Sequence, residues 1–124
     1  MRDRNTLKNA ARLRRKKHIR KVVSGTKKCP RLVVYRSLRN IYAQLVDDVE
    51  MVTLTGVSSL TPSLKEELSQ VKTPIERGEI IGQTIAKMAK KRKVKRVVFD
   101  RNGFPYHGQV KAVAEGARKG GLEF

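Results

Sequence analysis

The chain has 124 residues, enough for one domain with a modest core, and its 29 Lys and Arg against 11 Asp and Glu leave a formal net charge of +18. A charge this large repels itself, so a polyanionic partner is its simplest explanation. The sequence shows no apolar run long enough to span a membrane and no signal peptide, and its one cysteine, Cys29, cannot form an internal disulfide. We therefore expect a cytoplasmic protein with no membrane partner.

The positive charge is concentrated at the N-terminus. Residues 1–28 hold 12 Lys and Arg and one acid, whereas residues 29–124 hold 17 Lys and Arg and 10 acids. We therefore expect two parts, a basic arm over residues 1–28 and a globular domain over residues 29–124.

The arm has too few apolar residues to build a core of its own. Asn5 or Thr6 can cap a helix there, and Ser24-Gly25 can stop it. Like charges on neighbouring turns disfavour that helix in isolation, so we expect the arm to be largely disordered alone and to become ordered on binding. A solvated tail kept for solubility is the alternative.

An alternation of period two begins after the arm. Residues 32–35 and 41–46 are predicted strands joined by a polar hairpin loop at 36–40. The second strand has apolar side chains on one side and polar or aromatic ones on the other, namely Ile41, Ala43 and Leu45 against Tyr42 and Gln44. A third strand is predicted over 50–57. It places Val52 and Leu54 on one face and Thr53 and Thr55 on the other. The three strands form an antiparallel meander with one apolar face and one open, polar face.

Residues 58–72 are compatible with either a short amphipathic helix or a loop. A clear helix start follows, because Thr73 is an N-cap residue, Pro74 suits the first helical position and Glu76 completes a capping box. Gly78 and Gly82 lie inside this helix, where glycine is unfavourable by about 1 kcal/mol relative to alanine. We expect them to allow a close approach of the helix to the sheet.

The C-terminal part predicts one more strand and one more helix. Residues 94–99 form an apolar, β-branched run that ends at a turn over residues 100–103. After the loop 104–108, apolar residues recur at helical spacing until Gly120-Gly121, where a left-handed cap is expected. The order βββαβα predicts a two-layer α/β (α+β-like) domain with a mixed four-stranded sheet, both helices on one face and the other face open.

Three features point to RNA as the partner. The arm offers phosphate contacts that depend on salt. Tyr42 and Tyr106 are predicted at exposed positions, where rings stack on bases. Neutral groups on the same surfaces can read 2′-hydroxyls and base edges, and they come from Ser37, Asn40, Gln44 and His107.

Structural readings compete with these assignments. Tyr106 can instead cover the end of the sheet, His107 can cap the last helix, and residues 100–103 can be only a turn in which Asp100 bonds its own backbone. An enzymatic reading places Mg²⁺ for phosphodiester hydrolysis on Asp47, Asp48 and Asp100. Adjacent residues of a strand point to opposite sides, so at most one of the first two can join Asp100. We therefore expect no enzyme, no metal and no cofactor.

Two blocks, residues 35–48 and 97–124, together with the basic arm, resemble the bacterial large-subunit ribosomal protein eighteen, a family that binds 5S rRNA. The resemblance covers nearly the whole chain in the same order, although residues 55–72 match least. It implies a structural protein that attaches 5S rRNA to 23S rRNA in the central protuberance of the ribosome, near other proteins of that region.

The residues expected to bind RNA fall into two groups. Those of the arm supply phosphate contacts and are Arg2, Arg4, Arg12, Arg14, Arg15, Lys16, Lys17, Arg20 and Lys21. Those that the resemblance implies for the globular domain are Arg36, Ser37, Arg39, Asn40, Tyr42, Gln44, Arg101, Tyr106, His107, Gly108 and Lys111.

Overall fold

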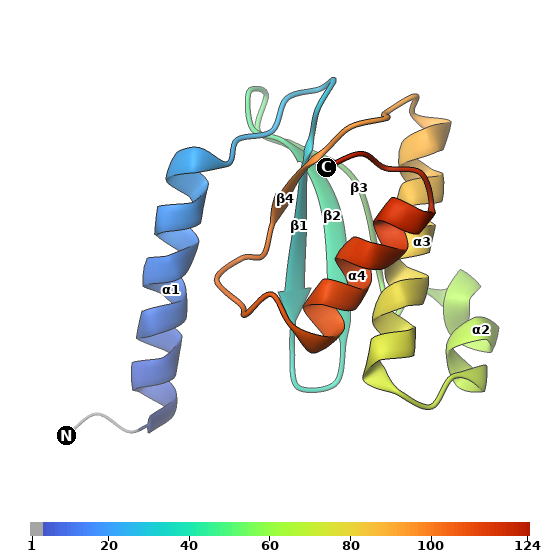
Figure 1. Ribbon diagram of the computed structural model, residues 1–124, viewed down its shortest axis with the longest axis horizontal. Helices are drawn as coiled ribbons and strands as arrows, with labels where there is room; N and C mark the ends of the chain where they lie inside the picture. The colour runs from blue at the N-terminus through green and yellow to red at the C-terminus, as the bar shows by residue number, and fades with distance from the viewer. Residues whose placement is uncertain (1–3) are drawn as a thin grey trace.

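The computed structural model describes residues 4–124, with side chains from Thr6 onward (Figure 1). Within these residues the elements are α1 (Arg4–Val22), β1 (Arg31–Arg36), β2 (Ile41–Asp47), β3 (Val52–Ser58), the 3₁₀ helix η1 (Pro62–Leu64), α2 (Lys65–Gln70), α3 (Pro74–Lys91), β4 (Val98–Asp100) and α4 (Gly108–Lys119). The order of strands and long helices after the arm is the predicted βββαβα.

The described strands form one mixed sheet in the order β3-β2-β1-β4. β1 pairs antiparallel with β2 and parallel with β4, and β2 pairs antiparallel with β3. α3 and α4 pack on the same face of this sheet. α1 lies apart from these two helices, beside the segment that follows β4 (Figure 1). The predicted two-layer architecture is confirmed, and α1 is an addition outside the two layers.

The meander has the predicted apolar face, with one exception in β3. Ile41, Ala43 and Leu45 are fully buried beneath the helices, as expected. A bulge opposite Leu45 and Val46 inserts one extra residue into β3, which reverses the alternation. Thr55 therefore turns toward Met88, with its Oγ1 4.0 Å from the sulfur, while Val52 is 49% exposed. The predicted alternation is therefore wrong at Thr55, whereas Leu54 packs against the core and Thr53 lines the open face as predicted.

α3 begins as predicted, with Thr73 Oγ1 accepting a hydrogen bond from the Glu76 amide. Its glycines do allow a close approach, but the partner is α4 and not the sheet. A Cβ on Gly82 would lie 2.1 Å from the Val113 carbonyl oxygen, and one on Gly116 of α4 would lie 2.3 Å from the Glu79 carbonyl oxygen. The two helices therefore cross with their backbones in contact.

Several boundaries differ from the predictions. α1 already includes Asn5 and Thr6, so neither is its cap, although the helix does end before Ser24-Gly25. β4 is shorter than the predicted strand 94–99, because its pairing with β1 begins only at Val98; Arg96 forms an isolated bridge to Glu123. At the end of α4, in contrast, the glycine pair has the predicted positive φ, which lies at Gly121 with +107°, while Gly120 stays helical.

The segment that the sequence left open is helical. Pro62 begins η1, and α2 follows directly from Lys65. Leu64 and Leu68 are buried against the core, whereas Leu60 is exposed. The proline thus starts a turn of helix and does not exclude one, in keeping with its tolerance at a first helical position.

Gly82→Ala should destabilise the fold, because a methyl group has no room against Val113 and the helices must separate. We expect a loss of about 1–3 kcal/mol in the free energy of unfolding, measured by urea denaturation. Lys87→Ala, on the exposed side of the same helix, is the control and should change stability by less than about 0.5 kcal/mol. Equal stabilities of Gly82→Ala and the native chain would contradict the close crossing.

Candidate nucleic-acid interface

α1 is fixed to the globular domain by side chains from one side of the helix. Arg12 Nη1 donates to the Asn102 carbonyl oxygen at 3.1 Å, and Arg15 Nε donates to the Gly103 carbonyl oxygen at 2.9 Å. The Arg12 guanidinium also lies over the Phe104 ring, 4.8 Å from its centroid. Arginines expected on RNA thus hold the arm on the turn that follows β4.

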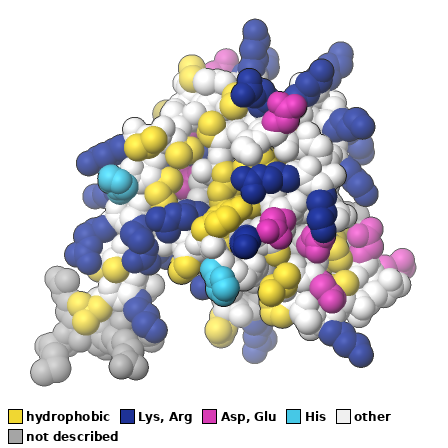
Figure 2. Space-filling model, in the orientation of Figure 1, with side chains coloured by type: hydrophobic (Ala, Val, Ile, Leu, Met, Phe, Trp, Pro, Cys, Tyr) yellow, Lys and Arg dark blue, Asp and Glu magenta, His cyan; other side chains and the backbone are white. Residues whose placement is uncertain are grey.

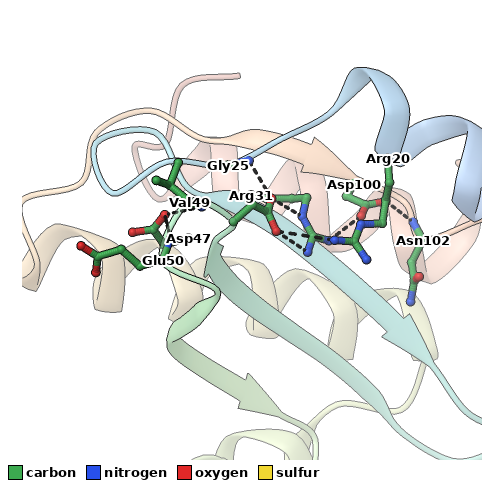
Figure 3. A network of polar contacts seen from close by, with 9 residues as sticks. Arg20, Gly25, Arg31, Asp47, Val49, Glu50, Asp100 and Asn102 are labelled. Carbon is green, nitrogen blue, oxygen red and sulfur yellow. Dashed lines mark hydrogen bonds and ion pairs between the residues drawn. The ribbon is translucent and has the colours of Figure 1, made fainter.

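A buried ionic network joins the base of the arm to the sheet (Figure 3). Arg31 donates to Asp48 through Nε and Nη2 at 2.9 and 3.0 Å, and to Asp100 Oδ2 through Nη1 at 2.7 Å. The Gly25 amide donates to Asp48 Oδ2 at 2.7 Å, and Arg20 Nη2 lies 3.7 Å from Asp48 Oδ1. One guanidinium therefore connects the turn after β2 to the end of β4, and the same aspartate holds the segment between α1 and β1.

The network shifts the pKa values of Arg31 and Asp48. Burial alone would lower the pKa of Arg31, but its hydrogen bonds to Asp48 and Asp100 outweigh burial and raise that pKa above its ordinary value. The hydrogen bonds from Arg31 lower the pKa of Asp48 in spite of partial burial, and the Gly25 amide and the Arg20 charge add to this effect. Both groups are therefore held in their charged forms.

The carboxylates of the nuclease hypothesis are occupied by protein groups. Asp48 and Asp100 share Arg31, and Asp47 Oδ1 accepts from the Val49 amide at 3.0 Å. Across residues 4–124 no group of three His, Cys, Asp or Glu side chains is placed to hold a metal ion. A cation in the middle of the acidic pair is the opposite of what a Mg²⁺ site requires.

The open face of the sheet, together with α1, forms a cleft of about 640 Å³, which we call the arm cleft. Its lining residues are Lys16, Arg20, Arg31, Val33, Tyr35, Tyr42, Gln44, Val46, Thr53 and Asn102. Tyr35 and Tyr42 are paired across β1 and β2, with ring centroids 5.9 Å apart. The structure thus brings the predicted Tyr42 and Gln44 together with two predicted cations of the arm.

Residues of the β1–β2 hairpin divide between two other hollows. Arg36 and Ser37 border one of about 890 Å³, together with Gly108. Arg39 and Asn40 border another, of about 570 Å³, beside α2. The loop is held in place because Ser37 Oγ donates to the Asn40 carbonyl oxygen within it and the Asn40 side chain accepts from Ser59, which follows β3.

The remaining predicted residues lie outside the arm cleft. Tyr106 packs edge-on against Phe99 and accepts a hydrogen bond from Arg118, so the reading of Tyr106 as a cover for the sheet end agrees with the structure, although the side chain is 42% exposed. His107 occupies the N-cap position of α4 without a capping hydrogen bond from its side chain. Lys111 lies 3.9 Å from Glu115 on the exposed side of that helix.

The turn at residues 100–103 has the geometry that the structural reading required. Asp100 Oδ1 accepts from the Asn102 amide at 2.7 Å, and Arg101 Nη1 donates to the Phe104 carbonyl oxygen at 2.9 Å. Gly108 has a φ of +57°, and nothing lies within 4 Å of where its Cβ would be. The backbone there is open to a partner, and its conformation favours glycine.

Among the described cations of α1, two sets differ in their contacts, while Lys8 and Lys16 border hollows. Arg12, Arg15 and Arg20 have protein partners, as described above. An exposed set, which we call the outer cations, consists of Arg14, Lys17 and Lys21. Arg2 lies outside the described residues, as does the side chain of Arg4.

The charge of the surface is uneven. α1 carries no acidic residue. Acidic side chains gather instead over α2 and the beginning of α3, on the side away from α1 (Figure 2), where Glu66, Glu67 and Glu76 lie in the first helical turns. α1 is therefore a positive part of the surface, and these acidic side chains lie away from it.

This fold and surface define a basic α/β protein that offers cations and rings to a polyanion. None of the helices in residues 4–124 is both long and apolar enough to cross a bilayer. The family model described as ribosomal L18 of archaea, bacteria, mitochondria and chloroplast matches residues 6–124. Its match over nearly the whole chain confirms the resemblance seen in the sequence.

Curated bacterial proteins named "Large ribosomal subunit protein uL18" are similar over most of their length. One from Caldicellulosiruptor saccharolyticus is 52% identical over 94% of each chain. One from Nitratidesulfovibrio vulgaris is 54% identical over 94% of this chain and 97% of its own, and one from Dictyoglomus turgidum is 53% identical over 90% and 93%. The chain belongs to this family of large-subunit ribosomal proteins, and its role is that of a ribosomal protein and not of an enzyme.

Asp48→Asn should destabilise the protein in a manner that depends on pH. The folded-state pKa of Asp48 is lowered, so its ionised form contributes stability above the ordinary aspartate value of about 3.9 and loses that contribution as pH falls through the folded value. We expect a cost of about 2–3 kcal/mol at neutral pH, less than for a fully buried pair. The difference from the native chain should shrink below about pH 4.

Urea denaturation at pH 6.5 and at pH 3 measures both differences. Glu115→Gln, which removes an exposed carboxylate, is the matched control and should change stability little at either pH. A cost for Asp48→Asn that stays the same at both pH values would show that the Arg31 network is not responsible.

Proposed function

We propose that this protein binds 5S rRNA and helps to attach it to 23S rRNA in the central protuberance, close to neighbouring ribosomal proteins. Membership of the ribosomal L18 family supports a place in the large subunit. The structural observation that supports an attachment role is the division of the arm's cations, because inner arginines fix α1 to the body while outer cations stay exposed.

Because the cations of α1 divide in this way, the molecule has two sides that can bind RNA. One side is the open face of the sheet, where Tyr42 and Gln44 lie beside Lys16. The other is the outer side of α1. Because α1 is fixed to the body, an RNA segment on its outer side and another on the sheet would be held at a set separation. We take 5S rRNA as the partner of the folded face, with the arm reaching 23S rRNA.

The hairpin and the start of α4 extend the proposed 5S rRNA surface. Arg36 and Ser37 border the same hollow as Gly108, whose open backbone can approach a phosphate or a ribose. His107 and Lys111 stand at the exposed side of the same helix start. In this proposal the protein works in the cytoplasm, within the ribosome. It neutralises phosphates, and its folded face fixes the position of the RNA on the protein. The proposal includes no cofactor.

Replacing the outer cations Arg14, Lys17 and Lys21 together by alanine should lower affinity for RNA that contains both rRNA partners. The slope of log affinity against log salt should fall by about 2–3 if each side chain meets a phosphate. The control replaces Lys87, Lys90 and Lys91, which are exposed on α3, and removes the same charge. Equal changes in slope for the two variants would show general attraction to polyanions.

A titration of 5S rRNA against a tRNA of similar size, at two salt concentrations, tests the choice of RNA. We expect the preference for 5S rRNA to persist at the higher salt, because specific contacts depend less on counterion release than general attraction does. Equal affinities at both salt concentrations would contradict the proposed function.

A further inference from the structure

Asn102 has a backbone conformation that few residues other than glycine adopt. Its φ is +55°, in the left-handed region, where asparagine is tolerated better than most side chains. The Asp100 carboxylate holds its amide at 2.7 Å, and Arg12 of α1 holds its carbonyl oxygen at 3.1 Å. Both contacts fix the backbone, and neither uses the carboxamide.

The carboxamide is buried, yet part of it has no protein partner. Asn102 is 5% exposed, and its Oδ1 has no hydrogen-bond partner among the described residues. Such a buried acceptor is unfavourable unless something donates to it, so native proteins leave few of them. A strained position that carries an unpaired polar atom is typical of a binding site.

Asn102 is one of the residues that line the arm cleft, whose other walls suit a nucleotide. Lys16 and Arg20 lie on the arm side of the cleft, while Tyr42 and Gln44 come from the sheet. At about 640 Å³ the cleft falls within the ordinary range for small-ligand sites, roughly 300–1,000 Å³. It therefore offers cations for a phosphate, a ring for a base and one acceptor for a donor group.

We propose that the arm cleft holds a single unpaired RNA nucleotide, which donates a hydrogen bond to Asn102 Oδ1. Its phosphate lies against Lys16 and Arg20, and its base rests on Tyr42. This inference rests on the proposed RNA-binding function. It adds that the open face recognises one unpaired nucleotide. The donor is either the ribose 2′-hydroxyl or an amino group on the base edge.

The test maps 2′-hydroxyl acylation of 5S rRNA, nucleotide by nucleotide, with the full-length protein bound. Asn102→Gly removes the carboxamide and retains the backbone groups and the positive φ, so the fold should be kept. Tyr42→Ala removes the ring from a different strand. We expect both variants to restore reactivity at the same unpaired nucleotide and to weaken binding about tenfold, the effect of one lost hydrogen bond or stacking contact.

Met51→Gly is the matched control. Met51 also has a positive φ, of +57°, but it is 87% exposed in the β2–β3 turn and does not line the cleft. It should leave both affinity and reactivity unchanged. A 2′-deoxy substitution at the protected nucleotide then separates the two donors, because it weakens binding only if the 2′-hydroxyl donates.

Two results would overturn the inference. One is that Asn102→Gly gives the native pattern and affinity while the native protein still prefers 5S rRNA over tRNA. The other is that the two variants expose different nucleotides. A native protein with no preference for 5S rRNA would instead count against the proposed function, so the two failures are distinguishable.

Discussion

The ionic contact of Arg31 with Asp48 and Asp100 is the constraint on which the placement of the arm depends. A guanidinium that is nearly buried must have its charge and its donors satisfied, and here two carboxylates from separate turns do so. The same Asp48 receives the Gly25 amide. The chain that leaves α1 is therefore fixed just before it enters the sheet, and α1 can lie beside the turn at Asn102.

The core and the arm are stabilised by different means. Beneath the sheet, α3 and α4 cross with their backbones in contact, and the apolar side chains of β1 and β2 that face these helices are fully buried. α1 has no comparable apolar side, since Leu7 and Leu13 are about half exposed. It depends on hydrogen bonds and on the Arg12 contact with Phe104. Salt and neighbouring anions should therefore affect the arm before they affect the core.

Much of the fold follows from local patterns in the sequence. Alternation predicted β2, and the Thr73-Pro74 start predicted α3, because these signals involve neighbouring residues. What could not be predicted depends on contacts between distant residues. The bulge in β3 is set by its pairing with β2, and nothing in the sequence around Gly82 says that its neighbour is α4 and not the sheet.

The candidate site shows the same limit. Without an apolar stripe in α1, the sequence does not tell which arginines face the body, so Arg12 and Lys17 were predicted to act alike. The sequence does not single out Arg31 as a partner of Asp48 and Asp100, because it follows a run of cations. The available signal is a single arginine at the start of an apolar strand, with acidic residues in two later turns. Asn102 was assigned only to a turn, which is correct for its backbone and incomplete for its side chain.

The acidic side chains over α2 and the start of α3 have a consequence for how the protein approaches its partner. With cations on one side and carboxylates on the other, the molecule has a dipole moment in addition to its net charge. In the field of a nucleic acid such a molecule experiences a torque, which turns the arm toward the phosphates before contact. Charge separation would in this way restrict the orientations in which a first collision occurs, and it would keep the acidic side directed outward.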